Sequence, residues 1–67
     1  MQDRESEIRD TIHDLNNALA TVLGSAELIV AASEEGSQTA RDAESIRIAA
    51  IRARDLVHRL RDCIGRG

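Results

Sequence analysis

The chain has 67 residues, a net charge of −3 and no Phe, Tyr or Trp. A chain this short, without aromatic side chains, lies near the lower limit for a self-sufficient hydrophobic core. Its mixed charge, with no basic surplus, argues against nucleic-acid binding. A lone cysteine excludes an internal disulfide and offers no cysteine pair for zinc. There is no long uninterrupted apolar run and no signal-peptide pattern, so we expect a soluble, cytoplasmic segment without membrane contact.

The first half of the chain has apolar residues at alternating steps of four and three. Such spacing is typical of a helix whose apolar stripe repeats every seven residues. We therefore predict a helix over about residues 3–33. Its stripe consists of Ile8, Ile12, Leu15, Leu19, Val22, Ala26 and Ile29.

The next segment is polar and predicts a turn at about residues 34–38. Gly36 can take the left-handed conformation that ends a helix. Thr39, with Asp42 three residues later, has the pattern of a capping box that opens a second helix, expected over about residues 39–64. The second stripe consists of Ile46, Ala50, Ala53, Val57, Leu60 and Ile64, broadened by Ala49, Leu56 and Cys63, and we expect Cys63 to be a small core residue.

These elements predict one all-α domain over residues 1–67, an antiparallel two-helix hairpin. Two helices side by side bury only a narrow seam, whereas both stripes include a third position in many heptads. Two hairpins related by a twofold axis would bury both stripes in a four-helix bundle. We therefore expect a homodimer. The alternative is a monomeric hairpin that is stable only within a larger protein.

The residues His-Asp-Leu-Asn-Asn-Ala-Leu at 13–19 are the most informative stretch of the chain. Residues three and four apart are neighbours on a helix, so we expect His13, Asn16 and Asn17 to share one patch outside the apolar stripe. Two successive asparagines cost helix stability without a local gain, which favours a function over a plain surface role. His58 has no comparable neighbours and is interpreted as a surface residue.

We call residues 13–19 the box. Together with Val-Leu-Gly-Ser-Ala-Glu-Leu at 22–28, the box resembles the first helix of the dimerisation and histidine-phosphotransfer domain of sensor histidine kinases. It is similar to the subgroup whose phosphoacceptor box reads His-Asp-Phe-Asn-Asn-Leu-Leu, with Leu15 in place of the Phe. Residues 48–60 resemble the second helix, without the aromatic residue often found near its end. The resemblance covers almost the whole chain. It implies that His13 accepts the γ-phosphoryl group of ATP and passes it to an aspartate on the receiver domain of a response regulator.

Phosphoryl transfer to an imidazole needs a free lone pair on one ring nitrogen and a proton held on the other. By resemblance, Asp14 acts as the base or holds this tautomer, although an ordinary solvent-facing carboxylate is the alternative. The resemblance also implies that Asn17 positions a water that removes phosphate from the partner's phospho-aspartate. Asn16 is the weaker candidate for that task.

The separate domain that binds ATP and Mg²⁺ in such kinases cannot be built from this chain, because its glycines are scattered and no strand-like alternation appears. We therefore expect no cofactor or metal in this chain and no kinase activity of the chain alone. Its end at residues 65–67 favours a domain excised from a longer kinase, whose ATP-binding domain would be a partner. The alternatives are a free-standing phosphotransfer protein of a phosphorelay and a purely structural dimerising hairpin.

A receiver domain must bring its aspartate to the histidine, so it is expected to dock along the bundle just past that residue. Ala20, Gly24 and Ser25 follow on the first helix, and in related kinases these places help to select the regulator. All three are small here, which predicts close approach by a receiver helix. Glu27 and Arg52 are the expected polar contacts at the rim.

Overall fold

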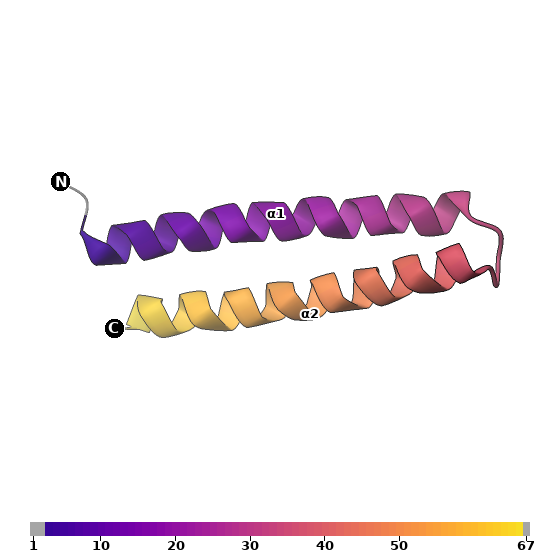
Figure 1. Ribbon diagram of the computed structural model, residues 1–67. Helices are drawn as coiled ribbons and strands as arrows, with labels where there is room; N and C mark the ends of the chain where they lie inside the picture. Colours follow the sequence, from indigo (N-terminus) through magenta and orange to yellow (C-terminus); the bar gives the residue numbers. More distant parts are fainter. Residues whose placement is uncertain (1–2, 67) are drawn as a thin grey trace.

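A computed structural model describes residues 3–66 and has two long helices (Figure 1). Helix α1 spans Arg4–Ala32 and helix α2 spans Gln38–Arg66, each of 29 residues. The two run antiparallel along an elongated body of 50 × 21 × 12 Å, and the start of α1 and the end of α2 lie opposite the turn. The described residues contain no strand. The predicted all-α hairpin is therefore confirmed.

Helix α1 begins with a side-chain cap. The carboxylate of Asp3 accepts a hydrogen bond from the Ser6 backbone N–H at 2.7 Å, which satisfies one of the donors that every helix start leaves unpaired. Glu5 and Glu7 lie in the first turn, where negative charge interacts favourably with the helix dipole. This start is strongly specified by local chemistry.

The turn between the helices combines an extended residue with a left-handed glycine. Ser33 leaves α1 in an extended conformation, and Gly36 takes a φ of +79°, as its lack of a Cβ allows. The predicted capping box at Thr39 and Asp42 is wrong. Ser37 caps α2 instead, because its hydroxyl accepts from the Ala40 N–H at 3.1 Å and places Thr39 already inside the helix.

The two helices contact each other mainly through one heptad position on each helix, so the buried residues recur every seven positions. On α2 the buried residues are Ala43, Ala50 and Val57, and on α1 they are Ile12 and Ala26 with half-buried Leu19 between them. Alanines dominate the middle of this contact, so the helix backbones can approach closely there. Ile12 and Val57 supply the larger side chains near the open end of the hairpin.

A second set of apolar residues, at the neighbouring heptad positions, is left without a partner. We call it the open apolar face. Within residues 3–66 nothing covers it, and its large side chains are 37% to 50% exposed. It comprises Ile8, Leu15, Val22 and Ile29 on α1, and Ile46, Ala53 and Leu60 on α2. Cys63 near its edge is also exposed, so the expected core position for this thiol is wrong in the hairpin, because no helix lies over it.

Helix α1 is also long and apolar enough to cross a membrane by length and composition, with a window of mean hydropathy 1.4. The apolar side of a helix in a soluble bundle meets the same criterion, because its apolar residues are counted wherever they lie around the helix. The hydropathy of α1 therefore does not distinguish between these two settings, and the cytoplasmic location stays a prediction.

Two glycines should respond in opposite directions to alanine. An added Cβ at Gly24 meets nothing within 4 Å, so Gly24→Ala should stabilise the chain by about 1 kcal/mol through helix propensity. Gly36→Ala should destabilise it by about 1 kcal/mol, because a Cβ is strained at positive φ. Urea unfolding at one fixed protein concentration measures both. Equal effects of the two substitutions would contradict the assigned backbone conformations.

Candidate functional site

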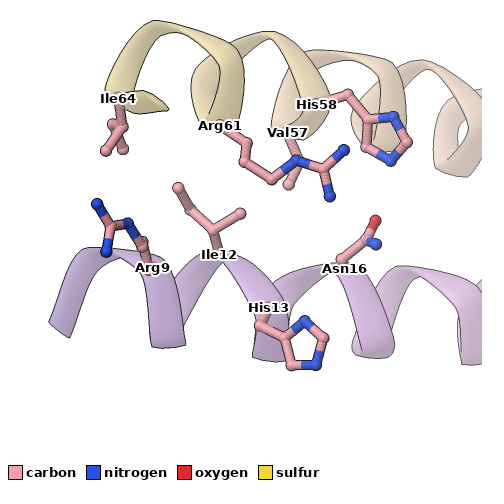
Figure 2. Close-up of a pocket in the computed structure, with 8 residues that line it drawn as sticks. All are labelled: Arg9, Ile12, His13, Asn16, Val57, His58, Arg61 and Ile64. Atoms are coloured by element: carbon pink, nitrogen blue, oxygen red, sulfur yellow. The ribbon is translucent and has the colours of Figure 1, made fainter. Parts of the chain in front are cut away.

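His13 projects from the outer side of α1. Its neighbour Ile12 is buried against α2, and one residue further on a helix turns the next side chain by about 100°. The imidazole is accordingly exposed, and its ring points away from α2 (Figure 2). The apolar contact that fixes this part of α1 therefore presents the ring to solvent, where another protein can reach it.

Asp14 and Asn17 are also exposed. Within residues 3–66 no hydrogen bond or ion pair joins the Asp14 carboxylate to the imidazole. Asn17 lies one turn beyond His13 on the same side of α1, and its backbone carbonyl accepts a hydrogen bond from the Thr21 hydroxyl at 3.2 Å. His13 and Asn17 thus form the outward part of the box, and both side chains are available to a docked partner.

Asn16 does not share that outward patch. Its side chain points towards α2, whereas the ring of His13 points away from α2 (Figure 2). The residue is half-buried, and its side-chain Oδ1 is buried without a hydrogen-bond partner. Buried polar atoms are nearly always paired, so this oxygen requires an explanation. His13 and Asn16 therefore line one cavity, as neighbours on the helix, but Asn16 is turned towards α2 whereas His13 and Asn17 face outward.

Asn16 lines a cavity between the helices, which we call the interhelical groove. It has a volume of about 180 Å³ and lies near the open end of the hairpin (Figure 2). Its lining residues are Arg9, Ile12, His13 and Asn16 from α1, and Val57, His58, Arg61 and Ile64 from α2.

His58 is exposed, as the sequence predicts, and it also lines the interhelical groove. The residues around His58 on α2 form no box like that of His13, but the fold places its ring across the groove from Asn16 (Figure 2). The signal was available in principle. Folding the two heptad patterns back on each other about the turn brings residue 58 opposite the start of the box. Only the antiparallel register, which is a tertiary property, makes the two neighbours.

The residues expected to dock a receiver fall on different sides of the hairpin. Ala20, Gly24 and Glu27 follow His13 at steps of seven, four and three residues, which keeps them on its side of α1. Ser25 precedes buried Ala26 and lies on the opposite flank. Arg52 is two residues past buried Ala50, which turns it to the outer side of α2, away from α1.

The structure also shows a polar contact that the sequence did not predict, between Arg47 and Glu44 on α2, and Arg47 interacts with the charge of Glu27. Arg47 on α2 donates two hydrogen bonds to the Glu44 carboxylate, one of them from Nε at 2.9 Å. This hydrogen bonding raises the pKa of Arg47, and the charges of Glu44 and then of Glu27 on α1 act in the same direction. The same contact lowers the pKa of Glu44. Arg47, rather than Arg52, is thus the α2 arginine near this part of α1.

The exposed imidazole of His13 is open to a partner protein. Within residues 3–66 no three His, Cys, Asp or Glu side chains gather in a way that could hold a metal ion. An exposed imidazole can act as a nucleophile, and Asp14, next to it in the sequence, is the nearest candidate base in the chain.

Comparison with protein-family models, with curated proteins and with solved structures finds no match to this chain. Its assignment therefore rests on the residues and on the geometry described above.

Proposed function

We propose that the chain is the phosphoacceptor and dimerisation module of a two-component histidine kinase. His13 takes the γ-phosphoryl group of ATP from a separate catalytic domain and passes it to an aspartate on a response-regulator receiver domain. The observation that carries the proposal is the exposure of His13 within the His-Asp-Leu-Asn-Asn box, on a hairpin whose buried contact turns the ring outward. The likeness of the box and both helices to the kinase domain supports it.

In this proposal the open apolar face is covered by a second copy of the chain. Six large aliphatic side chains at heptad positions remain 37% to 50% exposed, and burying the rest of each is worth about 1 kcal/mol. A twofold axis places the same face of a second hairpin against them and forms a four-helix bundle. His13 is one position away from the buried seam on the other flank, so dimerisation leaves the imidazole accessible.

Asp14 and Asn17 keep the roles that the resemblance implies. Asp14 orients the ring or takes its proton once a partner has docked, and Asn17, exposed beside His13, is the residue that positions water for dephosphorylation. Asn16 points into the interhelical groove, so it is poorly placed for that task in this arrangement.

The direct test is phosphate acceptance by the full chain. The chain is incubated with Mg-ATP and an isolated ATP-binding domain from a kinase with the same box, and separately with a phosphorylated receiver domain. We expect one acid-labile phosphate per chain from the first donor and return of phosphate to an unphosphorylated receiver. Acceptance from the receiver alone would instead indicate a free-standing phosphotransfer protein. No labelling from either donor would leave only the structural hairpin.

Receiver docking should depend on the small residue at position 24. Substituting Gly24 by Leu adds bulk on the side of α1 that carries His13, where nothing in the hairpin lies within 4 Å of a new Cβ. We expect phosphate transfer to a receiver to slow about tenfold or more, because small surfaces of this kind are sensitive to added repulsive contacts. Phosphorylation by the ATP-binding domain and dimerisation should stay unchanged.

Gly24→Ala is the matched control, because it improves helix propensity while adding little bulk. Transfer rates are measured by following loss of label from the phosphorylated chain. An unchanged rate for the leucine variant would show that the receiver docks elsewhere on the bundle.

A further inference from the structure

The interhelical groove lies on the flank of the hairpin that the open apolar face does not use. From Val57, a step of three residues leads to Leu60 on the open apolar face, whereas a step of four leads to Arg61 in the groove. His13 lines the same groove from α1. A second copy seated on the open apolar face therefore leaves this flank accessible, together with the imidazole.

Helix α2 carries an arginine at the same heptad position three times in succession on this flank. Arg47, Arg54 and Arg61 each lie four residues after a buried residue of α2. Arg47 interacts with the charge of Glu27 on α1, and Arg61 lines the groove, where Figure 2 shows its guanidinium between the two helices. Because both outer members of the row face this flank, the half-buried Arg54 between them faces it too.

The second and third arginines of this row lack a paired carboxylate. Glu44 accepts hydrogen bonds from Arg47, whereas no ion pair is found for Arg54 or Arg61 within residues 3–66. No carboxylate lies three or four positions from either of them on α2, and none lines the groove. The aspartate that follows each directly is turned by about 100° around the helix. We call Arg54 and Arg61 the flank arginines.

The flank arginines lie beside the surface on which a partner of His13 has to dock. Arg61 shares the groove with His13, so the two are nearly level along the hairpin. Because the helices are antiparallel, seven residues back on α2 correspond to seven residues forward on α1, and Arg54 therefore lies opposite Ala20. Seven residues span about 10 Å. This is one Debye length at about 0.1 M salt, so the two cations act together on an approaching charge.

We propose that the receiver domain docks on this flank through an acidic surface that faces Arg54 and Arg61. The inference rests on the proposed phosphate transfer from His13, and it names the chemistry by which the partner is recognised. The chain as a whole carries a charge of −3, so it repels an acidic partner except where positive charge is concentrated. The flank arginines thereby direct such a partner to the side of the hairpin that carries the imidazole.

The test follows phosphate transfer from the labelled full chain to the receiver domain that accepts it in the direct test above. The double variant Arg54→Gln, Arg61→Gln should lower the second-order transfer rate about tenfold at low ionic strength, because charges of this kind steer association. The rate at saturating receiver should stay unchanged, since the box is intact. Transfer from the parent chain should slow as salt rises, and the double variant should lose most of this salt dependence.

The chain supplies a matched control at the same spacing. Arg52 and Arg59 each lie two residues past a buried residue, which turns them to the outer side of α2. The double variant Arg52→Gln, Arg59→Gln makes the same change in net charge and should leave the transfer rate nearly unchanged. Equal slowing by the two double variants, or a parent rate that rises with salt, would overturn acidic docking while leaving phosphate transfer itself established.

A second measurement needs no phosphodonor. The isotopically labelled full chain is titrated with a short polyglutamate peptide and followed by NMR. The Nε–H signals of Arg54 and Arg61 should shift at lower peptide concentration than those of Arg52 and Arg59, because only the first pair lies on the basic flank. Equal shifts in both pairs would overturn the proposed preference for an acidic surface. A chain that no donor labels would instead overturn the proposed function, and with it the receiver domain as the partner.

Discussion

Replacing His13 by Gln should abolish phosphate acceptance, reducing labelling by an ATP-binding domain to background. Glutamine has no nucleophilic nitrogen, so no phosphorylated intermediate forms, whatever partner docks. The fold should be unaffected, because the imidazole points away from α2 and makes no hydrogen bond within the described residues. Helicity by circular dichroism and mass by light scattering should match those of the parent chain.

The chain offers its own control in the second histidine. His58→Gln removes the other imidazole while leaving the box intact, and the variant should label as fully as the parent chain. Labelling that survives in the His13 variant and disappears in the His58 variant would assign the phosphoacceptor to the interhelical groove. Loss of helicity in the His13 variant would contradict its outward, purely functional position.

Replacing Leu60 by Asp should dissociate the proposed dimer. The leucine is 50% exposed in the single hairpin and lies on the open apolar face. Each copy would lose about 1 kcal/mol of apolar burial, because half of the leucine is already covered in the hairpin. It would also place a carboxylate without a partner in the interface, at a cost of about 1–3 kcal/mol. Because the twofold axis doubles the change, the dissociation constant should rise about a thousandfold. Sedimentation equilibrium across a range of protein concentrations measures it.

Leu28→Asp is the matched control. Leu28 is 73% exposed, even more than Leu60, but it is off the open apolar face, on the side of α1 opposite the buried contact. The same substitution there should leave the association unchanged. Equal effects of the two variants would show that general hydrophobicity, and not this face, determines assembly. A parent chain of 7.3 kDa at micromolar concentration would remove the basis for the four-helix bundle.

The helices were predictable because the heptad spacing is a local property of the sequence, which a long uninterrupted helix preserves. Gly36 was predictable for the same reason, since few other residues accept a positive φ. The cap at Ser37 was missed because Ser37 and Thr39 both match capping chemistry, and the path of the turn decides between them. That path depends on where α1 ends, which the sequence fixes only to within a few residues.

The site was predictable only in part. The outward position of His13 follows from its place beside Ile12 in the stripe. The turn of Asn16 towards α2 does not, because spacing along one helix cannot say on which side of it the second helix will pack. The exposure of Cys63 has the same origin. The width of the apolar stripe on α2 predicts that some partner buries Cys63, but α1 does not cover this residue in the hairpin.

The run of alanines between the helices has a consequence for alignment. Ala26, Ala43 and Ala50 present nearly flat surfaces, and Ala43 and Ala50 are of equal size one heptad apart on α2. Sliding one helix past the other by a full heptad would therefore meet little resistance from the middle of the contact, since uniform packing specifies position poorly. The short connection around Gly36 and the paired bulk of Ile12 and Val57 act as stops at the two ends. Lengthening the turn should free the helices to slip before it loosens the helices themselves.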